Sequence, residues 1–269
     1  MCIRDRIDSE LEGVSFRVLN TDAQALLQSS AERRLQLGQN LTRGLGAGGN
    51  PSIGQKAAEE SREELQQALE GSDLVFIAAG MGGGTGTGAA PIVARAAKEV
   101  GALAVAIVTK PMALEFKDDL AEVGIKELRS EVDSLITIPN QKLSEVYGGD
   151  CTMLEAFGHA NDVLLGAVRG IADIITQTGY VNVDFNDVRT VMAEQGVAMM
   201  GTGIASGPSR AKDAAALAVG SPLLEDINLH SAKGVLVNIT GKGIKIGEIE
   251  DVLRQVSEFK SENAQIIHE

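Results

Sequence analysis

The chain has few of the side chains on which several classes of protein depend. It has no tryptophan and only two tyrosines, so aromatic platforms for single-stranded nucleic acid are not supported. Its two cysteines, Cys2 and Cys151, can form neither a disulfide framework nor a zinc site. That scarcity suits a reducing cytoplasm. The three histidines lie far apart in the sequence, which favours surface positions over a shared metal site.

Positive charge and long apolar runs are also scarce. The formal net charge is −13 and the isoelectric point is about 4.8. Nucleic acid is therefore disfavoured as a partner, because few cations are available to neutralise its phosphates. No run of 18 apolar residues occurs, and the charged opening residues lead into no apolar stretch. We expect a cytoplasmic protein with neither a signal peptide nor direct membrane insertion.

Strand and helix patterns alternate through the first two thirds of the 269 residues, and the remainder mixes strands and helices without strict βαβ regularity. Hydrophobic residues make up 44% of the chain. This composition is sufficient for one large core or two smaller ones. Apolar strands separated by helices predict an α/β fold with a parallel sheet covered on both faces. Strands are expected at 14–19, 73–79, 102–108, 134–138, 197–204, 233–240 and 264–268, and helices at 22–29, 51–70, 87–100, 121–131, 152–178, 184–194, 209–219 and 248–259.

The helix expected at 152–178 is the longest of these. At 1.5 Å per residue it spans roughly 40 Å, enough to connect two domains. We therefore predict domains at 1–151 and 180–269 with a connecting helix at 152–179. Its apolar residues recur at spacings of three and four, namely Met153, Phe157, Ala160, Leu164, Ala167, Ile171, Ile174 and Ile175.

A glycine-rich segment, GGGTGTG at 82–88, stands between a predicted strand and a predicted helix. Glycines allow the backbone to curl until several N–H groups point into one concavity, and the helix adds its positive end. These features predict a cradle for a di- or triphosphate, to which Thr85 and Thr87 can add hydroxyl donors. The segment lacks the lysine of GxxxxGK[ST] and the glycine spacing of GxGxxG.

A second glycine-rich loop, at 42–50, also enters a helix, at Pro51. It can close over a terminal phosphate with backbone N–H groups, with Ala47 and Gly48 near its centre. By itself this would be an ordinary loop. Paired with the segment at 82–88, it indicates a binding site.

Three residues are candidates for contacts to a base. Phe157 and Asn161 lie four apart on the long helix, hence on one face, so a ring can stack on a purine while an amide bonds its edge. The alternative is that Phe157 belongs to the core. Asn140, which follows Pro139, is a candidate for a second base contact or for a helix N-cap.

Two carboxylates, Asp184 and Asp187, follow the long helix in the segment that begins at Asn182. At a loop-to-helix junction such a pair can orient a water and accept its proton during attack on a γ-phosphate. A structural role is equally well supported by the sequence. Asp184 can be an N-cap, and Asp187 falls in a first helical turn, where acids are favoured.

These segments, in this order, resemble the FtsZ family of bacterial tubulin homologues, GTPases of cell division. The resemblance runs from about residue 11 to about residue 267. It rests on Asn20-Thr21-Asp22-Ala23-Gln24, GLGAG at 44–48, GGGTGTG at 82–88, Val108-Thr109-Lys110-Pro111, Thr137-Ile138-Pro139-Asn140, the segments at 182–185 and 187–192, and SPLLED at 221–226.

The resemblance implies a tubulin/FtsZ-like GTPase domain, a long central helix and a smaller α+β C-terminal domain. It implies GTP or GDP with Mg²⁺, a head-to-tail homopolymer, other cell-division proteins as partners and a place at the mid-cell division site. The implied GTP site consists of Asn20, Ala47, Gly48, Gly82, Gly83, Gly84, Thr85, Gly86, Thr87, Gly88, Glu115 at the ribose, Asn140, Phe157 and Asn161.

The resemblance also implies that Asn182, Asp184 and Asp187 serve the nucleotide of the next subunit. Two carboxylates beside a triphosphate in the same chain would repel it. Their delivery by a neighbour couples hydrolysis to assembly through a heterologous contact that does not close.

The chain departs from the family pattern in several places. The family's first strand and first glycine loop are missing, and we expect residues 1–6, which match nothing, to be a sequence artefact or a false start. The chain also ends before the family's last strand pair, linker and tail peptide. Asp119 replaces an arginine near the nucleotide, and Asn161 stands where many relatives carry aspartate.

Two alternatives follow. One is a non-hydrolysing truncated homologue that binds or caps filaments. The other is a nicotinamide dehydrogenase. That enzyme needs an acidic residue about twenty positions after its glycine loop, where this chain has an apolar strand at 103–108.

Overall fold

A computed structural model describes residues 13–147, 151–176, 183–193, 196–224, 232–257 and 260–268. It divides into two compact units, the first comprising Met1–Leu165 with Gln195–Val197 and the second Gly166–Glu194 with Ala198–Glu269. The division falls inside helix α8 (Met153–Thr176). The domain limits predicted at 151 and 179 stay a prediction.

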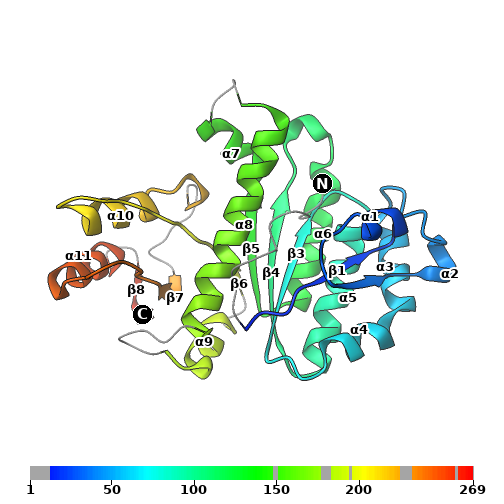
Figure 1. Cartoon of the computed structure of the whole chain (residues 1–269), viewed down its shortest axis with the longest axis horizontal. Coiled ribbons are helices and arrows are strands. Elements are labelled where there is room, and N and C mark those ends of the chain that lie inside the picture. The colour runs from blue at the N-terminus through cyan, green and yellow to red at the C-terminus, as the bar shows by residue number, and fades with distance from the viewer. Residues whose placement is uncertain are drawn as a thin grey trace. The chain divides into compact units, whose positions relative to one another are not determined.

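A four-stranded sheet forms the centre of the first unit (Figure 1). Its order is β3 (Leu74–Gly80), β4 (Leu103–Lys110), β5 (Ser134–Pro139) and β6 (Gly196–Ala198). β4 pairs in parallel with both β3 and β5. Seven of its eight residues are buried, as its unbroken apolar sequence predicts for an interior strand.

Helices α5 (Thr85–Glu99) and α6 (Asp118–Glu131) pack on this sheet, and α3 (Pro51–Glu60) packs on α5. The backbones of α3 and α5 approach closely at two glycines. A Cβ on Gly88 would lie 2.0 Å from the carbonyl oxygen of Pro51, and one on Gly54 would lie 2.2 Å from that of Gly84. Only glycine fits such a contact, so the start of α3 is fixed against the start of α5.

The single helix predicted at 51–70 is wrong in one respect. The structure has two helices, α3 and α4 (Arg62–Leu69), with a break at Ser61, where φ is −96° and ψ is 18°. Ser61 is buried, and its hydroxyl oxygen accepts the N–H of Gly38 at 3.0 Å. This tertiary hydrogen bond coincides with the break, and local sequence does not reveal it.

The first unit also contains elements that the sequence patterns did not predict. Strand β1 (Arg17–Asn20) was expected, but its parallel partner β2 (Arg33–Gln36) was not, because β2 begins with two exposed arginines. Helix α1 (Ala23–Leu27) was expected, whereas α2 (Gln39–Thr42), η1 (Ala113–Glu115) and α7 (Asn140–Tyr147) were not.

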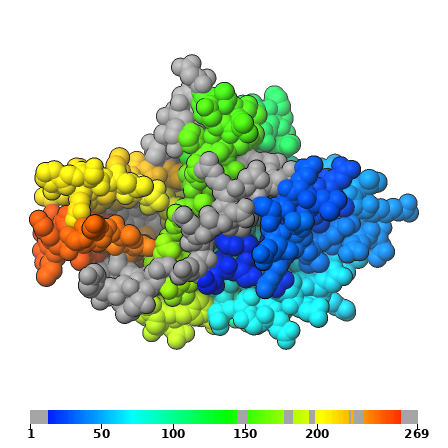
Figure 2. All heavy atoms as spheres, in the orientation of Figure 1, coloured from blue at the N-terminus to red at the C-terminus, as the bar shows by residue number. Residues whose placement is uncertain are grey.

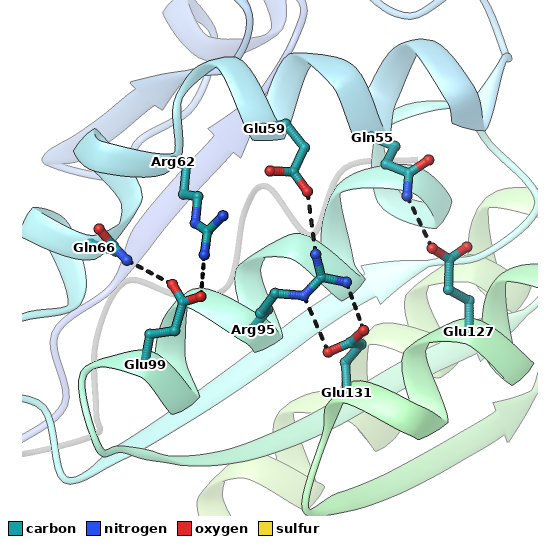
Figure 3. Close-up of polar contacts among 8 residues, drawn as sticks. All are labelled: Gln55, Glu59, Arg62, Gln66, Arg95, Glu99, Glu127 and Glu131. Atoms are coloured by element: carbon teal, nitrogen blue, oxygen red, sulfur yellow. Dashed lines mark hydrogen bonds and ion pairs between the residues drawn. The ribbon is translucent and has the colours of Figure 1, made fainter.

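Side-chain contacts join the helices of the first unit on their outer side (Figure 3). The guanidinium of Arg95 in α5 bonds Glu131 of α6 at 2.7 Å and Glu59 of α3 at 3.4 Å. The bond to Glu131 raises the pKa of Arg95, and a bond from Arg62 lowers the pKa of Glu99. These groups are partly exposed, so each pair contributes little to stability. Figure 3 also shows Gln66 bonded to Glu99 and Gln55 bonded to Glu127.

The second unit contains α9 (Phe185–Met192), α10 (Arg210–Val219), η2 (Pro222–Leu224), β7 (Ala232–Val237), α11 (Ile246–Ser257) and β8 (Lys260–His268). β7 and β8 pair in parallel. α10 and α11, yellow and orange-red, lie side by side (Figures 1 and 2). The Arg210 guanidinium joins them through the carboxylate of Glu248, with an Nε–Oε1 distance of 2.7 Å.

The strand predicted at 197–204 is longer than the one observed, since β6 ends at Ala198. The segment that follows lies directly on α10. A Cβ on Gly201 would be 1.9 Å from the carbonyl oxygen of Ala218, and one on Gly203 would be 1.9 Å from that of Ala214. The absence of a side chain at Gly201 and Gly203 therefore lets this segment lie against the backbone of α10.

Helix α8 confirms the predicted long helix and corrects its apolar stripe. The buried residues recur at helical spacing and comprise Ala156, Ala160, Leu164, Ala167, Val168, Ile171, Ala172 and Ile174. Met153, predicted on the stripe, is 49% exposed, and Phe157 is half-buried. Phe157, at the start of the second turn of α8, is therefore partly accessible, which the core interpretation did not anticipate.

Candidate functional site

The carboxyl ends of the parallel strands bring several predicted site segments to one edge of the first unit's sheet. Gly80 at the end of β3 is paired with Thr109 of β4, and Thr109 with Ile138 of β5. The segment 82–88, the segment after Lys110, and Asn140 therefore all follow this edge. In open parallel sheets ligands bind at the carboxyl ends of the strands.

The loop at 82–88 closes on itself and leaves a helix terminus available. The N–H of Gly82, whose φ is 93°, donates to the buried Oγ1 of Thr87 at 2.9 Å. Within the described part of the chain no side chain caps the N-terminus of α5. A Cβ on Gly83 would meet nothing within 4 Å. The first-turn N–H groups of α5 can therefore receive an anion.

The loop at 43–50 is built from left-handed glycines, with φ of 76° at Gly44, 85° at Gly46, 59° at Gly48 and 76° at Gly49. A Cβ on Gly48 or Gly49 would meet nothing within 4 Å, so these two positions face open space.

The two glycine loops touch each other. A Cβ on Gly84 would lie 2.8 Å from the nitrogen of Asn50 and 2.9 Å from the Cβ of the buried Ala47. The pairing of the loops that the sequence suggested is therefore present in the structure as direct contact.

Asn20 ends β1, and its Oδ1 accepts the N–H of Asp22 at 3.1 Å. The next residue, Thr21, is fully buried and bonds Thr85, with 2.7 Å between the two Oγ1 atoms. Asn20 and Thr85 are predicted from the sequence as site residues, whereas Thr21 appears there only as part of the motif that carries the family resemblance. The available signal was a hydroxyl residue at the end of a strand, directly after a predicted ligand.

Asn140 and Asn161, both predicted to contact the base, share a feature of their side-chain oxygens that the sequence does not reveal. The Oδ1 atoms of Asn140 and Asn161 are buried, and neither has a hydrogen-bond partner among the described residues. Asn140 begins α7, and Asn161 lies one turn after the half-buried Phe157. An unpaired buried carbonyl is costly, so both positions call for external N–H donors.

Glu115 closes the 3-10 turn η1, because its Oε1 accepts the N–H of Met112 at 3.0 Å. The next residue, Phe116, is 93% exposed and has a φ of 53°. Asp119 lies in the first turn of α6. The ribose contact of Glu115 stays a prediction.

The acidic candidates lie in the second unit. Asp184 is the N-cap of α9, and its Oδ1 accepts the N–H of Asp187 at 2.9 Å. Both residues are exposed. The capping role considered for Asp184 is therefore present, and it holds Asp187 in the first turn. Asn182 lies outside the described residues.

In the part of the chain that the structure describes, no three histidine, cysteine or acidic side chains are grouped to hold a metal ion. No helix in that part has the length and apolarity to span a membrane. The site therefore offers backbone N–H groups, hydroxyls and amides, which suit an anionic ligand with a polar ring.

A parallel sheet whose carboxyl edge carries two touching glycine loops and an uncapped helix terminus defines a nucleotide-binding α/β protein. Comparison with known families makes this specific. Residues 7–148 match the model described as the GTPase domain of the Tubulin/FtsZ family, and residues 196–269 match the C-terminal domain of the FtsZ family. The chain belongs to the FtsZ family of GTPases.

Individual relatives agree with this assignment. The chain is 58% identical over 268 residues to the cell division protein FtsZ of Coxiella burnetii, covering 98% of this chain and 69% of that protein. Its identity to the Pseudomonas aeruginosa protein of the same name is 55% over 261 residues, covering 96% and 66% respectively.

Solved structures agree as well. An FtsZ dimer from M. jannaschii superposes with a TM-score of 0.91 at 44% identity, covering 96% of this chain and 76% of that one. A CetZ2 protofilament structure from Haloferax volcanii, at 21% identity and a TM-score of 0.75, shares the fold.

These findings confirm the predicted family, the α/β fold and the GTPase class. They support the predicted function, a GTPase that polymerises in the division ring, and do not favour the non-hydrolysing alternative. Family membership supports GTP or GDP as the ligand. The roles of single residues stay predictions.

Proposed function

We propose that this GTPase binds GTP at the carboxyl edge of the first unit's sheet and hydrolyses it where two copies meet head to tail. The filaments so formed act in cell division, at the cytoplasmic mid-cell site and with other division proteins. The single observation that carries the binding proposal is the combination of an open N–H cradle with two buried amide oxygens that have no hydrogen-bond partner among the described residues.

In this proposal, the cradle formed by the two glycine loops and the start of α5 binds the phosphates. The N–H groups around Gly83 and at the start of α5, together with those of Gly48 and Gly49, converge from the two touching loops. Helix termini and curled glycine backbones favour phosphate oxygens through both hydrogen bonds and dipoles. The remaining predicted contacts, Asn20 and Glu115, complete the site at its edge.

The amides account for the base. Guanine presents two neighbouring N–H donors, N1–H and the 2-amino group, whereas adenine has an acceptor at N1. Carbonyl oxygens that lack donors therefore match guanine. The Oδ1 atoms of Asn140 and Asn161 supply such acceptors, and Phe157 can stack on the purine from the preceding turn.

The acidic segment accounts for hydrolysis. Asp187, exposed and held by the cap at Asp184, can orient a water and accept its proton. Because such charges would repel a phosphate chain in their own copy, we assign Asp184, Asp187 and Asn182 to the nucleotide of the next copy. Mg²⁺ bound to the triphosphate supplies charge neutralisation there.

GTP turnover with Mg²⁺ as a function of protein concentration tests this proposal. We expect a threshold concentration followed by a steep rise, because the site is completed only on assembly. Asp187→Ala should lower turnover by about a hundredfold or more while leaving GTP binding intact. Asp213→Ala, at an exposed acid in the first turn of α10, is the matched control and should retain turnover.

Mixing two variants distinguishes catalysis between copies from catalysis within one. Asp187→Ala retains the nucleotide site, and Asn161→Leu retains the acids. If the acids act on the next copy, the mixture recovers turnover that neither variant shows alone. Turnover proportional to concentration without a threshold, or no recovery on mixing, would contradict the proposal.

A further inference from the structure

One buried threonine contacts both glycine loops. Thr21 is 0% exposed. Its carbonyl oxygen accepts the N–H of Gly46 at 3.2 Å and lies 3.1 Å from the hydroxyl oxygen of Thr42, whose single hydrogen has the carbonyl oxygens of Thr21 and Gly38 as alternative acceptors. Its own hydroxyl oxygen lies 2.7 Å from that of Thr85, the first residue of α5. Thr21 therefore links the two halves of the cradle, which are far apart in the sequence.

The hydrogens of the hydroxyl pair can be counted. A threonine hydroxyl carries one hydrogen and accepts others, so in the pair one residue donates and the other accepts. Thr21 is enclosed, whereas Thr85 is half-buried at the start of α5. If Thr21 donates to Thr85, the Thr85 hydrogen is released for a ligand. If instead Thr85 donates its hydrogen to Thr21, only the acceptor lone pairs of Thr85 remain to face the ligand.

We propose that Thr21 is a positioning residue for the phosphate chain, acting through Thr85. A phosphate oxygen beside the first turn of α5 selects the polarity in which Thr21 donates to Thr85 and Thr85 donates to the phosphate. Successive hydroxyl donors in a buried site strengthen one another. Thr21 never touches the nucleotide, yet it fixes the direction of the hydrogen that does. This inference rests on the proposed GTP site.

The test is the dissociation constant for GTP and GDP of the full chain and its variants. Thr21→Val keeps the shape of the side chain and removes the hydroxyl, so we expect affinity about tenfold weaker. Thr21→Ser restores the hydroxyl and should recover most of the loss. Thr176→Val removes a hydroxyl bonded to the Ala172 carbonyl in α8 and is the matched control, with unchanged affinity.

Two readouts separate positioning from a general structural effect. If Thr21 acts through Thr85, the double variant Thr21→Val with Thr85→Val binds no more weakly than Thr85→Val alone. Guanosine, which has no phosphate, should compete equally well in all variants. Additive losses, or an equal loss of guanosine binding, would overturn the inference in favour of a distorted loop.

The outcomes also distinguish this inference from the proposed function. If the unsubstituted chain binds GTP and Thr21→Val binds it equally well, only the role of Thr21 is rejected. No GTP binding by the unsubstituted chain would reject both. If thermal unfolding shows that Thr21→Val is not folded, the GTP affinity of Thr85→Val is measured instead, because Thr85 is only half-buried. Unchanged GTP affinity in Thr85→Val would reject a role of the Thr21–Thr85 hydroxyl pair in GTP binding.

Discussion

The two units of the chain are stabilised in different ways. In the first unit β4 is buried at seven of eight positions and α5 at ten of fifteen. In the second unit β7 has no buried residue, and α10 and α11 have one each, Ala215 and Val252, while its other buried side chains lie in α9 and in the part of α8 after Leu165. The Arg210–Glu248 ion pair joins α10 to α11, with further bonds from Arg210 to the carbonyls of Lys242 and Gly243 at 3.0 Å.

The difference indicates what each unit requires. A phosphate cradle made of backbone N–H groups works only if the backbone stays in place, and a dense apolar core provides that. The contact between α10 and α11, which rests on a charged and partly exposed ion pair, responds instead to pH and salt. The comparison therefore predicts that packing changes act mainly on the first unit and charge changes mainly on the second.

The largest expected effect is on the core of the first unit. Ile107→Ala, at a fully buried position in β4, should lower the free energy of unfolding by about 4 kcal/mol, because it removes buried methylenes and leaves a cavity. Chemical denaturation measures the change. Ile246→Ala in the second unit, at a side chain that is 78% exposed, is the control and should change stability by about 0.5 kcal/mol or less. Equal losses would contradict the comparison.

A smaller but more local effect is expected at the contact between α3 and α5. Gly88→Ala places a methyl 2.0 Å from the Pro51 carbonyl oxygen and should cost about 3 kcal/mol of stability. Gly83→Ala, whose Cβ meets nothing within 4 Å, should leave the thermal midpoint nearly unchanged while weakening GTP binding. The opposite ranking of the two variants would show that the close contact is absent.

The smallest expected effect is a pH dependence of the second unit. The hydrogen bond from Arg210 lowers the pKa of Glu248 from 4.5 to about 2. A depressed pKa in the folded state gives stability that is present above the unfolded value and is lost as pH falls from about 4.5 toward 2. Protection of α10 and α11 amides in hydrogen exchange should therefore decrease over that window.

Glu248→Gln provides the control for this pH dependence. It should lower protection of α10 and α11 at pH 5 and largely remove the further decrease below it. Glu99→Gln alters a first-unit carboxyl whose pKa is lowered by Arg62, and we expect it to change protection less, because apolar packing holds α5. An equal response in both units would remove the distinction between them.

The sequence predicted the parts of the fold that depend on local patterns. Burial and backbone freedom determine the apolar run of β4, the glycine loops and the periodicity of α8. These features can therefore be recognised from the sequence alone. The helix break at Ser61 and the short β6 coincide with contacts to tertiary partners, namely Gly38 and α10. No local pattern reports such partners, which is why both were missed.

The candidate site divides in the same way. The cradle residues were recognisable because two glycine-rich loops each enter a helix, and it is this pairing that indicates a binding site. That the oxygens of Asn140 and Asn161 lack partners within the described part of the chain could not be predicted, because it depends on everything packed around them. Thr21 was missed because its role arises from a hydroxyl 64 positions away in the sequence.

The contact between α3 and α5 has a consequence for how this protein can vary. Neither Gly54 nor Gly88 has room for a methyl group, because each faces the backbone of the other helix. A larger residue in one helix is tolerated only if the other helix moves away, and that movement displaces the loop that precedes it. The two glycine loops, separate in the sequence, are therefore constrained to change together over evolutionary time.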